Sequence, residues 1–191
     1  MFGNKKEEYT VEIVGHLFLD AAYVVAKGMI DKNKNVLKDI GINKFDNETL
    51  IELTILGLYI RIKCIEKYAP ISLRLKESLI QSMKKSYNWW IKESFTSAND
   101  SEYYKYFNEL LSSRIKTYEK IYNLIDNKDK DFIEAGMEAG EILFITWERI
   151  LSTEKSIKNI FDTAPLFDFF INKVMQIFPA TVEFIKNIKI K

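Results

Sequence analysis

The stretch LIELTILGLYIRIKCI, residues 50–65, is the part of the sequence that decides the fold. Its apolar side chains cover well over half the circumference of a helix, and it is too long for an ordinary strand of about 5–6 residues. Its charged residues are Glu52, Arg61 and Lys63. A membrane-spanning helix needs about 20 residues nearly free of charge. The stretch therefore predicts a largely buried helix in the core of a soluble protein.

The sequence around this stretch predicts further helices. Glycine and proline are scarce, 7 and 3 among 191 residues, so the chain has few turns and long elements. Apolar residues recur every three or four positions, which is the helical period. They predict helices over residues 8–30, 36–40, 46–68, 72–95, 101–125, 131–151, 152–162 and 163–179. We expect an all-α fold in a single domain, residues 1–191, forming a bundle or irregular array of six to eight mostly antiparallel helices.

The C-terminal tail, residues 180–191, is expected to be loosely packed. Pro179 should bend or end the helix before it, because proline lacks the backbone N–H that a helix interior uses. Polar and apolar residues alternate from Ile185 to Lys191, a pattern typical of a strand. This segment is too short to found a sheet, so no sheet is expected.

Composition and charge restrict the functional classes. The chain has 28 Lys and Arg against 27 Asp and Glu, a net charge of +1, which disfavours a nucleic-acid partner. The single cysteine, Cys64, cannot form an internal disulfide and suits a reducing compartment. The N-terminus shows no pattern typical of a signal peptide, and charged residues interrupt the apolar stretch 11–30. We therefore expect a cytoplasmic protein with no membrane span and no cofactor.

Two acidic patterns suggest a metal. Glu12, His16 and Asp20 recur every four residues and would share one helix face. The interpretation we favour is that they are ordinary surface residues on the solvent-exposed edge of that helix. Because His16 is the only histidine, a ferritin-like di-iron site with two Glu-x-x-His pairs is excluded.

The second acidic pattern is formed by Glu134, Glu138 and Glu141 within the predicted helix 131–151. Carboxylates on one helix face can hold Mg²⁺ and position phosphates, as in all-α metal-dependent phosphohydrolases. The second acidic pair that such enzymes carry downstream is incomplete here. The glutamates could instead be a charged outer face.

Aromatic residues gather on both sides of the predicted loop near Asn99. They include Trp89, Trp90, Tyr103, Tyr104 and Tyr106. Adjacent residues on a helix lie about 100° apart, so Trp89 and Trp90 cannot both face one core. Most of the group should be core, with an exposed edge that could hold a ligand or a protein partner.

These observations favour a non-enzymatic interaction or regulatory module with a protein partner, or one that self-associates as a homodimer. Two alternatives stay open. One is a metal-dependent phosphohydrolase that uses the carboxylates of residues 131–151. The other is a helical bundle with a small-ligand pocket between its helices.

Overall fold

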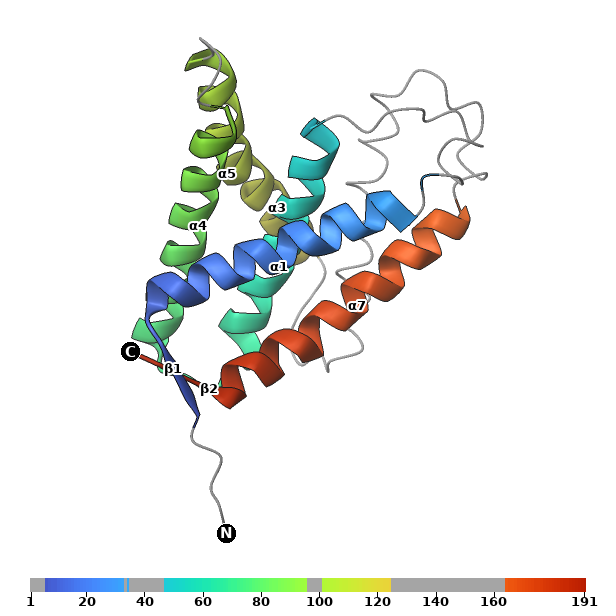
Figure 1. Ribbon diagram of the computed structural model, residues 1–191. Helices are drawn as coiled ribbons and strands as arrows, with labels where there is room; N and C mark the ends of the chain where they lie inside the picture. Colours follow the sequence, from blue (N-terminus) through green and yellow to red (C-terminus); the bar gives the residue numbers. More distant parts are fainter. Residues whose placement is uncertain (1–5, 33, 35–46, 96–100, 125–163) are drawn as a thin grey trace.

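The computed structural model describes residues 6–32, 34, 47–95, 101–124 and 164–191. The elements in chain order are β1 (Glu7–Tyr9), α1 (Val11–Lys32), α3 (Asn47–Tyr68), α4 (Leu73–Phe95), α5 (Ser101–Leu124), α7 (Ala164–Asn187) and β2 (Ile188–Ile190) (Figure 1). Long helices make up most of this part of the chain, so the all-α expectation is confirmed there. The helices predicted over residues 36–40, 131–151 and 152–162 lie outside the described residues.

Helix α3 is the centre of the described structure. Every residue from Ile51 to Ile62 is buried, and α3 packs against α1, α4, α5 and α7. In Figure 1 the other four helices surround it, with α1 crossing its face. The prediction of a largely buried helix from the stretch 50–65 is confirmed, since apolar side chains on all sides of a helix must be covered on all sides.

Small residues let α1 approach two neighbouring helices closely. A Cβ atom added at Gly15 would lie 2.9 Å from the backbone carbonyl carbon of Ser82 on α4. A Cβ atom added at Gly57 on α3 would lie 3.2 Å from the Cβ of Ala22. Helix α1 therefore crosses α4 at Gly15, where the backbones of the two helices come close together.

Helix α1 is buried on one side only. Val14, Phe18 and Ala22 face the core, whereas Ile13 and Val24 are 46% and 65% exposed. Among the described helices, α1 alone is long and apolar enough to cross a membrane by length and composition. A core helix of a soluble protein meets the same criterion, and the inner face of α1 packs against α3 and α4.

The C-terminal tail departs from the expectation. Helix α7 continues through Pro179 to Asn187, and β2 pairs in parallel with β1, with Glu7 opposite Ile188. The expectation of no sheet was wrong because β1 supplies a partner strand from the other end of the sequence. A two-stranded sheet is marginal by itself, but Ile185 and Ile188 are buried and anchor the tail.

The same sheet explains why α1 starts later than predicted. Residues 7–9 are extended in β1, and Thr10 follows as the N-cap of α1. Its side-chain oxygen accepts a hydrogen bond of 3.3 Å from the backbone N–H of Ile13. Such a hydroxyl satisfies one of the backbone donors left open at a helix start.

Candidate functional site

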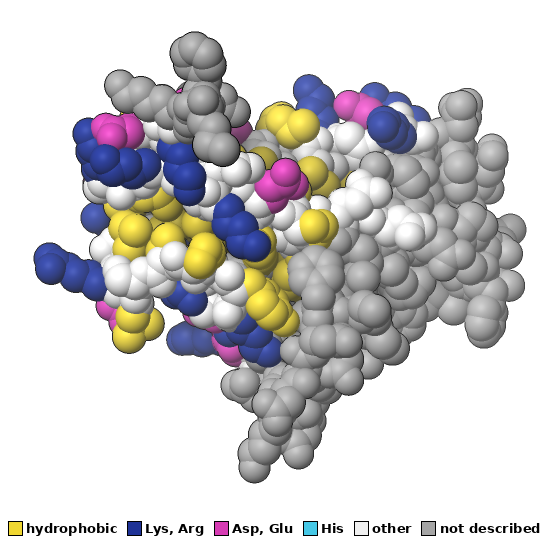
Figure 2. Space-filling view, turned by 90° about the horizontal axis from the view of Figure 1, so that it is seen from below, with side chains coloured by type: hydrophobic (Ala, Val, Ile, Leu, Met, Phe, Trp, Pro, Cys, Tyr) yellow, Lys and Arg dark blue, Asp and Glu magenta, His cyan; other side chains and the backbone are white. Residues whose placement is uncertain are grey.

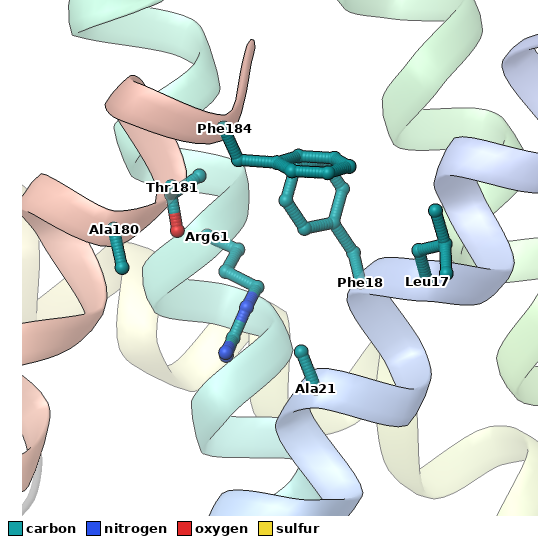
Figure 3. Close-up of a pocket in the computed structure, with 7 residues that line it drawn as sticks. All are labelled: Leu17, Phe18, Ala21, Arg61, Ala180, Thr181 and Phe184. Atoms are coloured by element: carbon teal, nitrogen blue, oxygen red, sulfur yellow. The ribbon is translucent and has the colours of Figure 1, made fainter. Parts of the chain in front are cut away.

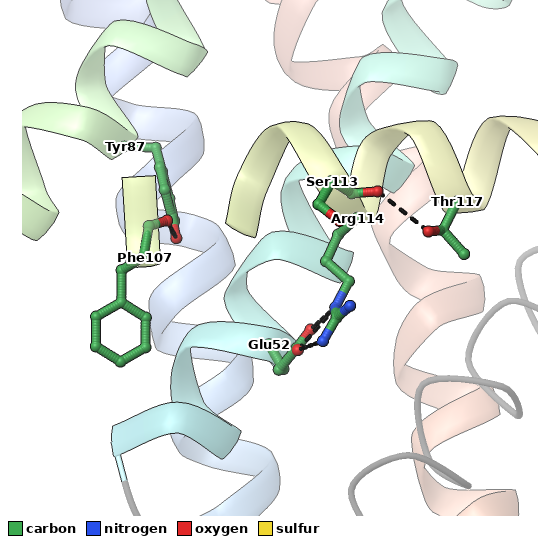
Figure 4. A network of polar contacts seen from close by, with 6 residues as sticks. All are labelled: Glu52, Tyr87, Phe107, Ser113, Arg114 and Thr117. Atoms are coloured by element: carbon green, nitrogen blue, oxygen red, sulfur yellow. Dashed lines mark hydrogen bonds and ion pairs between the residues drawn. The ribbon is translucent and has the colours of Figure 1, made fainter. Parts of the chain in front are cut away.

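The polar network between α3 and α5 is a structural connection. Arg114 donates from Nε to both carboxylate oxygens of Glu52, at 2.7 and 2.8 Å, and its Nη2 also contacts Oε1 (Figure 4). The hydrogen bonds that Arg114 donates to the Glu52 carboxylate raise the pKa of Arg114. Nearby, the hydroxyl of Tyr87 on α4 donates to the backbone oxygen of Phe107 at 3.0 Å. The charge of the buried Glu52 is thereby matched within the protein.

A partly open cavity lies between α1, α3 and α7. Its volume is about 280 Å³. The described residues that line it are Leu17, Phe18, Ala21, Arg61, Ala180, Thr181 and Phe184 (Figure 3). The cavity is open to solvent beside Leu17 and Ala180, both of which are exposed. Among these described residues, only Arg61 and Thr181 are polar.

Arg61 is the unusual group in this cavity. Its residue is 5% exposed, and its Nη1 donates to the backbone oxygen of Gly57, one turn earlier in α3, at 2.9 Å. Burial lowers the pKa of Arg61 to about 10, so the side chain stays cationic at neutral pH. Within the described part of the chain, no carboxylate forms an ion pair with it.

The other charged side chains in the middle of α3 have partners. Glu52 binds Arg114, and Lys63 forms ion pairs with Glu66 at 2.8 Å and Glu119 at 2.6 Å. Arg61 differs from these two residues because its side chain lines a cavity and has no ion-pair partner among the described residues.

The α7 wall of the cavity is held at the turn around Pro179. The hydroxyl of Thr181 donates to the backbone oxygen of Ile177 at 2.7 Å. The thiol of Cys64 on α3 donates to the backbone oxygen of Phe178, with 3.5 Å between the heavy atoms. Burial raises the pKa of Cys64 to about 11, so this group is a neutral thiol at neutral pH. The two contacts keep α7 helical and attached to α3 across the proline.

Two aromatic rings that contact each other form one end of the cavity. Phe18 of α1 and Phe184 of α7 pack edge to face, with ring centroids 5.5 Å apart and planes at 76°. Figure 3 shows them together at one side of the cavity, with Arg61 and Thr181 on the other. The cavity thus has an apolar end and a polar end.

The residues of the first predicted metal site lie along α1. Glu12, His16 and Asp20 are all exposed, and the His16 ring packs against Trp89 at 5.5 Å and 87°. Hydrogen bonds from the Glu12 backbone and the Thr10 hydroxyl lower the pKa of Glu12. No group of three or more His, Cys, Asp or Glu able to hold a metal ion occurs among the described residues.

The second predicted metal site cannot be placed. Glu134, Glu138 and Glu141 lie outside the described residues. A metal site built from them, alone or with residues of α1, stays a prediction.

The predicted aromatic surface is divided among several environments. Trp89 is 55% exposed and Tyr106 46%, whereas Trp90 is half-buried and packs edge-on against Tyr23 and Tyr87. The two tryptophans thus point to different surroundings, as their offset on the helix predicted. Tyr103 and Tyr104 belong to α5, but their side chains lie outside the description.

Hydrophobic side chains are also visible on the surface. Figure 2 shows several of them on the described side of the molecule, bordered by lysines and arginines. On α1, the exposed apolar residues are Ile13, Leu17 and Val24. Their spacing places them along one side of the helix, and Leu17 also lines the cavity.

Sequence reasoning did not identify Arg61, Thr181 and Phe184 as site residues. A signal was present for Arg61, because an arginine within an otherwise apolar helix needs a counter-charge or a polar surface. Nothing in the sequence pairs α3 with α7. No protein-family model, curated protein or solved structure matches the chain, so the functional argument depends on the geometry of the cavity.

Proposed function

We propose that this protein is a non-catalytic helical module that binds a small ligand in the cavity between α1, α3 and α7. The observation that supports this proposal is an apolar cavity of about 280 Å³ with a buried arginine in its wall. Ligand sites are concave and mostly apolar, with a few placed polar groups that orient the ligand, and they measure roughly 300–1,000 Å³ for drug-sized ligands. The size of this cavity favours a smaller ligand.

The polar groups of the cavity favour binding over chemistry. The Thr181 hydroxyl donates its proton to a backbone oxygen, and Arg61 is a donor that stays charged at neutral pH. Both can orient a bound molecule. The lone cysteine, Cys64, is a buried thiol, which supports a reducing, intracellular location as part of this proposal.

The test is a binding screen combined with a cavity-filling variant. Small neutral, anionic and cationic amphiphiles are titrated against the full chain, with NMR chemical shifts and calorimetry as readouts. At least one class should bind, and Ala21→Leu should weaken that binding at least tenfold by occupying part of the cavity. Val24→Leu is the matched control, because Val24 is on the same helix and 65% exposed. Wild-type protein that binds none of the probes would refute the proposal, as would an Ala21→Leu variant that binds as well as wild type.

A second candidate function is a protein contact through α1. Ile13 and Leu17 are 46% and 37% exposed on this helix, and Trp89 of α4 is 55% exposed. Tryptophan and apolar side chains are enriched in the cores of protein interfaces. One side of α1 carries exposed apolar residues. In an array of six to eight helices, this side could be covered by a second copy of the chain or by another protein partner.

A further inference from the structure

The guanidinium of Arg61 has more hydrogen-bond donors than the described protein groups use. A guanidinium carries five N–H donors, and the described structure gives it one acceptor, the backbone oxygen of Gly57. Figure 3 shows the side chain extending from α3 into the space between α1 and α7. A buried charge without a partner destabilises the folded state. An acceptor that enters the cavity would offset that cost.

The described neighbours of Arg61 do not supply a negative charge. Thr181 is neutral and donates its proton to Ile177. Cys64 is a neutral thiol that donates to the backbone oxygen of Phe178. The other described side chains that line the cavity are apolar. The counter-charge that the geometry of the cavity accommodates is therefore one that a ligand brings.

We infer that the ligand is a small apolar monocarboxylate, whose carboxylate binds Arg61 while its apolar part packs against Phe18 and Phe184. This inference rests on the proposed function. Arginine matches a carboxylate with two parallel N–H···O bonds, which are stronger than hydrogen bonds between neutral groups. The polar end of the cavity at Arg61 and Thr181 and the apolar end at the two rings correspond to the two ends of such a molecule.

Other ligand classes fit the cavity less well. A cationic ligand would be repelled by Arg61, and a neutral apolar ligand would leave the guanidinium donors unpaired after displacing water from them. A phosphate dianion needs several donors to replace its hydration, and the described lining has one cation among apolar side chains. The small volume of the cavity, about 280 Å³, favours a chain or ring of modest size.

The experiment compares probes of one shape and different charge. Octanoate, octan-1-ol, octylamine and inorganic phosphate are titrated calorimetrically against wild type, Arg61→Met and Arg74→Met. Octanoate should bind wild type at least tenfold more tightly than octan-1-ol, and octylamine and phosphate should bind more weakly still. Arg61→Met should lose the preference for octanoate while it keeps its affinity for octan-1-ol. Arg74→Met is the matched control, because Arg74 is exposed on α4, and it should behave as wild type.

The possible failures are distinguishable. If octan-1-ol binds wild type as tightly as octanoate and Ala21→Leu abolishes both, the ligand-binding function stands and the monocarboxylate inference is overturned. If none of the four probes binds, both are overturned, whereas binding of octylamine or phosphate alone would overturn only the monocarboxylate inference. Arg61→Lys covers the case of a misfolded Arg61→Met, since it keeps the charge but loses the planar pair of donors. It should lose octanoate affinity severalfold and keep that for octan-1-ol, and unchanged octanoate affinity in a folded Arg61 variant would overturn the inference.

A second readout separates ligand binding from a purely structural role. Without ligand, Arg61→Met should melt at the same temperature as wild type or higher, because methionine fills a similar volume without an unpaired buried charge. A structural role for Arg61 predicts a clearly lower melting temperature for the folded variant, and that result would count against the inference.

Discussion

At the scale of single residues, the chemistry of the cavity depends on two buried side chains, Arg61 and Cys64. Arg61 and Cys64 are one helical turn apart on α3, and both face the side on which α7 packs. The charge of Arg61 within an apolar stretch could be recognised from the sequence, because buried charges require partners. Which residues surround it could not, since Thr181 and Phe184 belong to a helix far along the chain. His16 is a different case. Its spacing in the sequence suggested a metal ligand, and in the structure its ring packs against Trp89.

Cys64 provides a prediction about pH. Burial raises its pKa from 9.0 to about 11 in the folded protein, whereas the unfolded thiol ionises near 9.0. The folded state therefore binds the proton more tightly, and its stability should fall as pH rises through 9 towards 11. At pH 10 this loss should be about 1 kcal/mol at most. Urea unfolding of wild type and Cys64→Ala at pH 8 and pH 10 measures it.

The comparison of the two proteins removes the titration of lysines and tyrosines that they share. Wild type should lose more stability than Cys64→Ala between the two pH values. Equal losses in the two proteins would show that Cys64 does not ionise differently on folding.

At the scale of elements, the packing of α1 depends on glycines that are not equivalent. A Cβ at Gly15 would collide with Ser82 of α4, whereas nothing lies within 4 Å of a Cβ at Gly28. Glycine in a helix interior costs about 1 kcal/mol relative to alanine. At Gly15 the missing side chain permits a close helix crossing that offsets this cost. At Gly28 no neighbour requires a glycine.

These two positions form a matched pair of variants. Gly15→Ala should destabilise the protein by about 1–3 kcal/mol, because α1 must shift away from the Ser82 backbone. Gly28→Ala should stabilise it by up to about 1 kcal/mol through the higher helix propensity of alanine. Chemical denaturation monitored by circular dichroism gives both values. Similar changes of the same sign would mean that α1 does not approach α4 as closely as the structure shows.

Helix positions followed from local sequence more closely than strand positions did. Helices α3, α4 and α5 begin and end within one or two residues of the predicted bounds. A long helix can be predicted in this way because its apolar residues repeat every three or four positions along the sequence. A strand of three residues contains almost no such information. The partner of β1 lies about 180 residues further along the sequence. The pairing therefore depends on how the helices pack, and the local sequence does not reveal it.

At the scale of the whole molecule, the exposed side of α1 tests the second candidate function. If this surface mediates self-association, wild type should be dimeric at micromolar concentrations, and Val24→Lys should make it monomeric by placing a charge in the interface. Leu73→Lys is the control, because Leu73 is a 72% exposed apolar residue on α4, and it should leave the dimer intact. Size-exclusion chromatography with light scattering measures the mass. A monomeric wild type throughout this range would rule out a homodimer.

The arrangement of the cavity could not be predicted from sequence at this scale. The apolar periodicity of α1 and α3 showed that both bury a face, but periodicity does not say which helices meet. The cavity forms because α7 packs on α3 and approaches α1 through Phe184. Its volume depends on small residues such as Ala21 and Ala180 at that meeting point.

The pairing of β1 with β2 has a consequence for biosynthesis. Residues 7–9 are translated well before their partners at 188–190. Domains fold as units while the chain is being made, and α1, α3 and α4 can pack together before α7 exists. Strand β1 must then stay unpaired until residues 188–190 have been made, and the cavity lacks one wall until residues 177–184 emerge. A nascent chain that stalls before that point would present α1 and α3 without the surface that covers Cys64 and Arg61.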